Sequence, residues 1–375
     1  MKPSRGADKG VLFLSTGVFA NGGIQRFNQT LLHAFEQLGI RYRVLSLSDS
    51  PLAIAKNPKL NGDSITGFNG DRRRFVLAVF AEIMRNRYEW VLIGHVNFAA
   101  LAMMLLAPRR LHVPRTMLIA HGIEVWDGIG GLRRLALQRV DRILCVSRYT
   151  RRRILEQAPS LAADQLVIFP NAIADTWASV APQPFGRHLP PRFILSVTRL
   201  EPGDRYKGIA TVIEAFSMLA DRAMQYYVIG QGADLPFLQL VAERCGVKDR
   251  VHFVQGASDS ELTALYQKCT AFVLPSGKEG FGIVFLEAMF FGAPVIAARE
   301  KGAMDVVQDG ETGISVDFGN VVAVKQSIEA LASDGPLRER LRANGRSLVT
   351  DGGAFTFASF MRRCAKVFGR DATAA

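Results

Sequence analysis

Residues 274–298 read L-P-S-G-K-E-G-F-G-I-V-F-L-E-A-M-F-F-G-A-P-V-I-A-A and predict a strand, a loop, a helix and a second strand in succession. The apolar run from Ala271 to Leu274 is typical of a buried strand, and the run from Ile283 to Phe291 is long enough for a helix. Gly292 then ends that helix before the next apolar run. This order of elements is typical of an α/β fold with a parallel sheet.

Two carboxylates flank the start of this helix. Glu279 falls in the loop and Glu287 two turns into the helix, so both can contact one ligand that lies across the helix N-terminus. Gly280 and Gly282 let backbone N–H groups approach that ligand, and the helix dipole favours a negative charge there. The alternative is two solvated surface charges, but Glu287 lies among apolar neighbours, where a carboxylate needs a partner. The pattern indicates an anionic ligand with hydroxyl groups.

The same string resembles the E-x7-E motif of glycosyltransferase family 4, whose members are retaining enzymes with the GT-B fold. The resemblance extends along nearly all 375 residues. It implies that Glu279 binds the hydroxyls of a donor sugar and that Glu287 binds the ribose hydroxyls of a nucleotide. It also implies that Gly280, Phe281 and Gly282 line the site of the nucleotide-sugar donor.

A glycine loop follows the first predicted strand, Val11 to Ser15. Gly22 and Gly23 stand at the start of the next helical pattern, where they would let the backbone approach a phosphate or a sugar. A plain tight turn is the alternative. The loop does not match the dinucleotide fingerprint G-x-G-x-x-G. It resembles the glycine loop of family 4, which faces the diphosphate and sugar of the donor.

A histidine follows the predicted strand Thr116 to Ala120. Residues 121–126 read H-G-I-E-V-W, and a residue at the carboxyl end of such a strand points toward the ligand site of an open α/β sheet. A lone histidine is more often structural. This six-residue sequence, however, resembles that of bacterial exopolysaccharide mannosyltransferases, and this implies that His121 contacts the donor sugar.

A predicted phosphate site follows the strand Phe193 to Val197. Arg199 and Lys207 emerge at the end of this strand and at the start of the next helix, where a diphosphate would be held. The family pattern has the arginine and the lysine five residues apart, whereas Arg199 and Lys207 are eight apart with Arg205 between them. Arg205 is therefore an alternative phosphate ligand, and we favour Arg199 because it comes directly after the strand. Gly230 begins a G-x-G turn that we expect beneath the nucleotide.

The basic charge is concentrated in one half of the chain. Residues 1–182 carry a net charge of +11 and residues 183–375 a net charge of +1. The basic half has no zinc spacing, recognition helix or aromatic RNA-binding signature, so we expect no nucleic-acid partner. An anionic membrane surface or a phosphorylated acceptor fits the charge as well.

A helix is predicted over Asp71 to Trp90, with arginines at both ends. Its apolar residues fit an ordinary helix with one face on the core. They also fit a helix that lies on a membrane surface with its arginines at the headgroups. Further arginines, Arg109, Arg110 and Arg151 to Arg153, adjoin other apolar segments.

The chain contains no predicted membrane-spanning segment. Its longest apolar run, Val96 to Ala107, is too short to cross a bilayer, and no signal-peptide core precedes the first strand. The cysteines have no paired spacing and are typical of reduced, buried thiols in a cytoplasmic protein. We therefore expect a cytoplasmic protein that associates peripherally with the inner face of the membrane.

Strands alternate with helices in both halves and predict two doubly wound, Rossmann-like domains. The resemblance implies that they face each other across a cleft, as in GT-B enzymes. We expect an acceptor-binding domain over residues 1–182, a nucleotide-sugar-binding domain over residues 192–353, and a C-terminal helix over residues 354–375 that returns to the first domain. The proline-rich stretch 181–191 is the predicted linker.

No D-x-D triplet occurs in the chain, so we expect neither a catalytic metal nor a cofactor. The resemblance implies a retaining transfer, with mannose from GDP-mannose as the favoured donor and a lipid-diphosphate-linked saccharide as the favoured acceptor. Three alternatives remain: a UDP-sugar transferase with a soluble acceptor, a sugar-nucleotide 2-epimerase, and a non-catalytic nucleotide-sugar-binding protein.

Overall fold

The computed structural model describes residues 10–20, 22–57, 60–101, 114–126, 128–181, 183, 185–186, 189–299, 302–350 and 352–369. The contacts divide the chain into two compact units. Unit 1 comprises Met1–Asn171 and Phe357–Ala375, and unit 2 comprises Ala172–Thr356. The division falls ten residues before the linker that we expected. The second half of the apolar run from Val96 to Ala107, together with Arg109 and Arg110, lies outside the described residues.

Unit 1 contains a parallel sheet of seven strands in the order β3-β2-β1-β4-β5-β6-β7. The strands are β1 Val11–Ser15, β2 Tyr42–Ser46, β3 Ile65–Gly67, β4 Trp90–Ile93, β5 Arg115–Ala120, β6 Arg142–Cys145 and β7 Leu166–Ile168. The described helices are α1 Gly23–Gln37, α2 Pro51–Ala55, α3 Arg72–Arg85, α5 Gly131–Arg139, α6 Arg148–Gln157 and α13 Phe357–Phe368.

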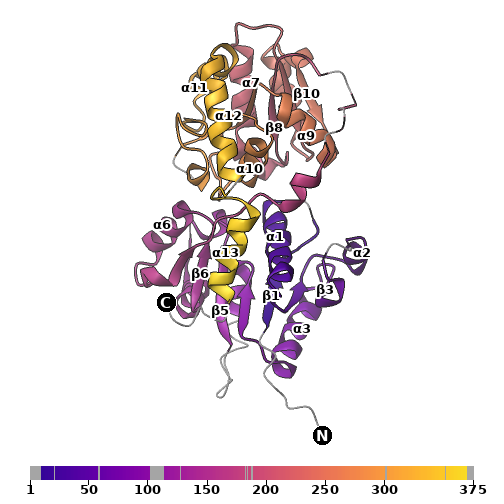
Figure 1. Cartoon of the computed structure of the whole chain (residues 1–375), viewed down its shortest axis with the longest axis vertical. Coiled ribbons are helices and arrows are strands. Elements are labelled where there is room, and N and C mark those ends of the chain that lie inside the picture. The colour runs from indigo at the N-terminus through magenta and orange to yellow at the C-terminus, as the bar shows by residue number, and fades with distance from the viewer. Residues whose placement is uncertain are drawn as a thin grey trace. The chain divides into compact units, whose positions relative to one another are not determined.

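The central strands of this sheet are continuous apolar runs because helices cover both of their faces. Every residue of β1 is buried. Helix α1 presents Phe27 and Phe35 to the interior, and α13 packs beside it (Figure 1). Phe360 and Phe368 of α13 meet these two rings at centroid distances of 5.8 and 4.9 Å. The C-terminal helix therefore belongs to the core of unit 1.

The predicted helix over Asp71 to Trp90 was too long. Helix α3 ends at Arg85 because Asn86 takes an extended conformation, and Trp90 already begins strand β4. Asp71 caps the helix, since its side chain accepts a hydrogen bond from the Arg74 N–H.

Unit 2 contains a parallel sheet of six strands in the order β10-β9-β8-β11-β12-β13. The strands are β8 Phe193–Val197, β9 Gln225–Ile229, β10 Val251–Val254, β11 Ala271–Leu274, β12 Val295–Ala298 and β13 Ile314–Val316. The helices are α7 Ile209–Ser217, α8 Leu235–Arg244, α9 Asp259–Lys268, α10 Ile283–Phe290, α11 Val321–Ser333 and α12 Gly335–Val349.

Each sheet has one point where the strand order reverses. These topological switch points lie between β1 and β4 in unit 1 and between β8 and β11 in unit 2. Open α/β sheets bind ligands beyond the carboxyl ends of the strands at such points. The loops after these four strands are therefore where a site is expected.

Candidate active site

Lys207 and Glu279 meet at the switch point of unit 2. Lys207 ends a 3-10 helix, Pro202–Lys207, that follows β8, and Glu279 lies in the loop after β11. The Lys207 ammonium donates to Glu279 Oε2 at 2.8 Å, and both side chains are mostly buried, with exposed fractions of 17% and 13%. Two residues that are 72 positions apart in sequence thus form one charged pair.

The two loops that carry this pair are in contact along their length. Gly208 has a φ of +78°, and a Cβ atom there would approach the Pro275 carbonyl oxygen to 2.7 Å. The Gly277 N–H donates to the Tyr206 carbonyl at 2.6 Å. A larger residue at 208 would therefore separate the loops and break the ion pair.

The two candidate phosphate ligands have different surroundings. Arg205 donates from Nε and Nη2 to the buried carboxylate of Asp234, and its guanidinium lies 3.9 Å from the centroid of the Phe237 ring. Arg199 makes one ion pair, with Asp204 at 3.2 Å, and its side chain is 65% exposed. The structure therefore holds Arg205 in a bidentate contact and leaves Arg199 the freer of the two to reorient.

The glycines of the E-x7-E segment shape the start of α10. Gly282 takes a left-handed φ of +93° at the N-cap, a conformation that favours glycine. The Gly280 carbonyl oxygen lies so close to Gly302 that a Cβ atom on Gly302 would be 2.0 Å from this oxygen. The Phe281 side chain is buried and packs against Phe355 at 5.5 Å, so only the Phe281 backbone can face a ligand.

Glu287 is buried in the second turn of α10, with an exposed fraction of 4%. The hydroxyl of the fully buried Tyr266 donates to Glu287 Oε2 at 3.3 Å. The expected partner for this carboxylate therefore exists, and it comes from α9. Tyr266 could not be identified from the sequence because nothing in its local pattern relates it to α10.

The G-x-G turn after β9 supports the segment that carries Arg199. Cβ atoms on Gly230 and Gly232 would approach the carbonyl oxygens of Thr198 and Leu200 to 1.8 and 2.1 Å. Only glycine permits this close packing of two backbone segments. Gly230 thus positions the candidate phosphate loop.

In unit 1 the glycine loop lies between β1 and α1. Gly22 is the N-cap of α1 and makes no side-chain capping hydrogen bond, and Gly23 is the first helical residue. A Cβ atom on Gly23 would meet no heavy atom within 4 Å. Packing within the described part of unit 1 therefore does not require glycine at position 23, which is consistent with the approach of a ligand.

Asp49 holds this loop in place from the end of β2. Its buried carboxylate accepts the Val18 N–H at 2.7 Å, the Phe19 N–H at 3.1 Å and the Ser46 hydroxyl at 2.6 Å. No motif in the sequence pointed to Asp49. Its position just beyond the short apolar segment that forms β2 was the available signal, because ligand loops occur at that edge of the sheet.

His121 lies at the end of β5, next to the switch point of unit 1. Its Nε2 atom is 3.1 Å from the Gly94 carbonyl oxygen, and its ring meets Phe27 edge-on at 5.2 Å. Burial, together with the charge of His95, lowers the pKa of His121 to about 3. The Glu124 carboxylate accepts the His121 N–H at 2.6 Å and fixes the turn. His121 is therefore neutral at physiological pH.

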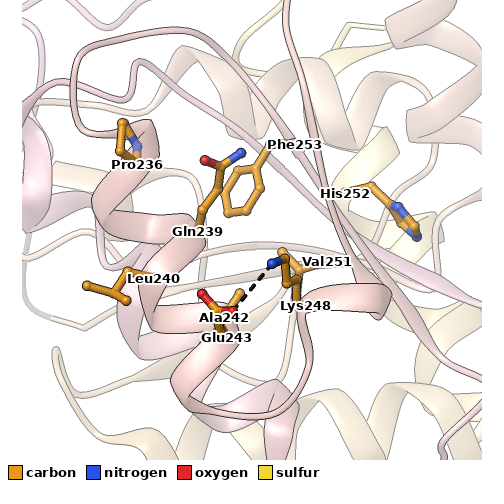
Figure 2. Close-up of a pocket in the computed structure, with 9 residues that line it drawn as sticks. All are labelled: Pro236, Gln239, Leu240, Ala242, Glu243, Lys248, Val251, His252 and Phe253. Carbon is orange, nitrogen blue, oxygen red and sulfur yellow. Dashed lines mark hydrogen bonds and ion pairs between the residues drawn. The ribbon is translucent and has the colours of Figure 1, made fainter.

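A separate hollow of about 580 Å³ lies against the edge strand β10 of unit 2 (Figure 2). Its lining includes Leu240, Val251 and a Lys248–Glu243 ion pair of 3.4 Å. Its lining comes from α8, from Lys248 and from the first three residues of β10, and it includes neither Lys207 nor Glu279. It does not belong to the candidate active site.

Two kinds of feature are absent from the residues that the structure describes. Among them, no three His, Cys, Asp or Glu side chains come together in a group that could hold a metal ion. Within the same residues, no helix combines the length and the apolar character needed to cross a bilayer.

Two family models match this chain. Residues 21–177 match Glycosyltransferase Family 4, and residues 181–348 match Glycosyl transferases group 1. The chain is 32% identical over 277 residues to the GDP-mannose-dependent alpha-(1-6)-phosphatidylinositol monomannoside mannosyltransferase of Mycolicibacterium smegmatis, a match that covers 68% of this chain and 70% of the relative. It is also 32% identical over 145 residues to the lipopolysaccharide core biosynthesis glycosyltransferase LpsE of Rhizobium meliloti, which covers 38% of this chain and 41% of LpsE.

Solved structures with the same fold cover nearly the whole chain. HepE of Anabaena, solved in complex with UDP, has a TM-score of 0.75 at 17% identity and covers 96% of this chain and 99% of its own. Sucrose-phosphate synthase of Thermosynechococcus elongatus has a TM-score of 0.76 at 18% identity, with coverages of 98% and 100%. These likenesses confirm the predicted GT-B fold with its two Rossmann-like domains. The family models and the mycobacterial relative show that the chain belongs to glycosyltransferase family 4.

Proposed function

We propose that this glycosyltransferase moves mannose from GDP-mannose to a lipid-linked saccharide, with retention of configuration and without a metal, in the synthesis of a surface polysaccharide. The observation that carries the proposal is the mostly buried Lys207–Glu279 pair at the switch point of unit 2. It provides one cation for a diphosphate and one carboxylate for sugar hydroxyls at the same place. The names of the mycobacterial relative and of LpsE support the choice of donor and acceptor.

The cations of unit 2 supply the charge that the leaving diphosphate requires. Lys207 uses one ammonium proton on Glu279, and two remain for phosphate oxygens. Arg199 emerges from the end of β8 and adds a second cation once it leaves Asp204. Positioned donors of this kind stabilise charge that develops in the transition state. This assignment needs no metal ion and no cofactor.

In the proposed reaction the acceptor hydroxyl attacks the anomeric carbon from the face that the diphosphate leaves. The new bond joins the acceptor oxygen to this carbon as the bond from the carbon to the phosphate oxygen breaks. The departing phosphate takes the hydroxyl proton, so no enzymic nucleophile is required. Glu279 binds the sugar hydroxyls, and Glu287 binds the ribose hydroxyls from its buried position in α10.

His121 contributes to this scheme as a neutral group. The contact of Nε2 with the Gly94 carbonyl requires a proton on Nε2, and this leaves Nδ1 as an acceptor. Nδ1 can then accept a hydrogen bond from a sugar hydroxyl. A neutral imidazole adds no positive charge near the anomeric carbon, where positive charge develops in glycosyl transfer.

The excess of basic residues in residues 1–182 supports a place at the inner face of the membrane, where lipid-linked acceptors lie. A UDP-sugar transferase is the second candidate function, and the UDP complex of HepE favours it. Mass spectrometry of the protein incubated with a panel of nucleotide sugars tests both. Consumption of GDP-mannose that requires a lipid-linked acceptor supports the proposal, whereas consumption of UDP-sugars alone would replace it with the second candidate.

A further inference from the structure

Helix α3 of unit 1 has one buried apolar face and one exposed apolar face. Phe75 and Val79 are buried against the core of the sheet. Leu77, Phe80 and Met84 point outward, with exposed fractions of 68%, 52% and 60%. At 100° per residue these three side chains fall within one 60° sector, so they form a single stripe along the helix. We call Leu77, Phe80 and Met84 the outer stripe.

Basic residues flank the outer stripe at both ends. Arg72, Arg73 and Arg74 form the first turn of α3, Arg85 ends the helix, and Arg87 follows it; all five are exposed. An exposed apolar stripe with arginines at its ends matches the layers of a bilayer, where acyl chains lie beneath anionic headgroups.

The acidic residue of α3 does not oppose this charge. Glu82 is the only carboxylate within the helix, and it is turned away from the stripe. It lies 3.7 Å from Arg43, accepts a hydrogen bond from Asn86 at 2.6 Å and contacts the Tyr88 hydroxyl. These contacts tie Glu82 to strand β2 and to the segment before β4, and they leave the outer face basic and apolar.

We propose that the outer stripe and its arginines are the surface by which unit 1 binds anionic lipid bilayers. The inference deepens the proposed function, on which it rests for the membrane-bound acceptor, because it assigns the attachment to one helix. A protein partner would also cover an apolar stripe, but the five exposed arginines favour an anionic surface that neutralises all of them at once.

Sedimentation with vesicles tests the proposal. The wild-type protein should bind vesicles of phosphatidylcholine mixed with phosphatidylglycerol, bind phosphatidylcholine alone weakly, and be released by salt. Replacing Leu77, Phe80 and Met84 together by glutamine should weaken binding about 100-fold or more, because the apolar area that inserts is lost. Replacing Arg72, Arg73 and Arg74 by glutamine should weaken it about 100-fold, at roughly fivefold for each charge.

A matched control comes from unit 2. Met218 and Val322 are 50% and 51% exposed, and their replacement by glutamine should leave vesicle binding unchanged. Folding of every variant is checked by circular dichroism. As a second measurement, the Phe80→Trp variant keeps the stripe apolar, and its added fluorescence should shift to the blue and be quenched by brominated lipid. Wild-type binding that survives the glutamine variants, or an added fluorescence in Phe80→Trp that vesicles do not change, would overturn the proposal.

The transfer assay separates this proposal from the proposed function. With a short-chain, water-soluble acceptor, the glutamine variants of the outer stripe should retain wild-type activity. Transfer to that acceptor without any vesicle binding by the wild-type protein would refute the membrane surface and leave the proposed function standing. If vesicle binding needs the outer stripe but no sugar nucleotide supports transfer, the proposed function is refuted and the membrane surface stands.

Discussion

The candidate sites of the two units use different physical means. In unit 2 the site consists of charged side chains that neutralise one another, such as Lys207 with Glu279 and Arg205 with Asp234. In unit 1 the corresponding switch point holds a glycine loop and a histidine whose pKa is depressed to about 3. Under the proposed function, the charged side chains of unit 2 stabilise the charge of the diphosphate, whereas unit 1 contributes the neutral His121.

The largest expected effects lie in the charged site. Lys207→Ala and Glu287→Ala should each lower kcat for transfer about 10²- to 10³-fold, because each removes one positioned contact to the donor. Lys248→Ala is the matched control, since Lys248 also pairs with a glutamate but lies at the hollow beside β10. Steady-state kinetics with GDP-mannose measures the difference. Near wild-type rates for Lys207→Ala would place the diphosphate elsewhere.

Alanine substitutions of Arg199 and Arg205 should affect transfer activity and Tm differently. Arg199→Ala should reduce transfer strongly with little change in Tm, because Arg199 is exposed and makes one ion pair. Arg205→Ala should lower Tm more than activity, since it removes the partner of the buried Asp234 carboxylate. Kinetics and thermal melting of both variants test this. Inactivation by Arg205→Ala at an unchanged Tm would make Arg205 the phosphate ligand.

The glycine loop of unit 1 should respond less to mutation. Asp49→Asn leaves one acceptor oxygen where two backbone N–H donors and one hydroxyl now bind, at a cost of about 1–3 kcal/mol. We expect the KM for the donor to rise about tenfold with a smaller change in kcat. A loosened loop weakens donor binding, whereas it leaves the charge stabilisation in unit 2 nearly unchanged. An equal loss in kcat with KM unchanged would contradict a positioning role.

Local patterns predicted most of the fold but not the contacts between distant loops. Strand β1 and helix α10 follow from apolar runs and glycines close in sequence, and the bounds differ by at most one residue. Strands β3 and β13 are three residues long and too short to show a pattern. Tyr266 contacts helix α10 at a residue 21 positions away, and Asp49 binds a loop 30 or more positions away, so only the folded chain relates them to the site.

His121 should make the stability of unit 1 sensitive to acid. Because burial lowers the pKa of His121 from 6.5 to about 3, the unfolded chain binds more protons than the folded one between these values. Stability should therefore fall as pH drops below 6.5, by about 1 kcal/mol per pH unit from this group. Urea unfolding of wild-type protein and of His121→Asn at several pH values measures the contribution of His121 to the pH dependence of the unfolding free energy. Equal pH dependence of the two proteins would show that His121 does not contribute it.

The smallest expected effect concerns metal ions and tests whether the charge in unit 2 is supplied by the protein alone. If Lys207 and Arg199 neutralise the leaving diphosphate, incubation with EDTA should change the transfer rate less than about twofold. Adding Mg²⁺ or Mn²⁺ after EDTA should then have no further effect. A Lys207→Ala variant sharpens the result, because a divalent cation bound to the donor could replace the lost ammonium charge and restore part of its rate. Loss of wild-type activity with EDTA and its recovery with Mg²⁺ would mean that Lys207 and Arg199 are insufficient. The contrast between the charged site of unit 2 and the neutral His121 of unit 1 would then omit the largest charge at the site.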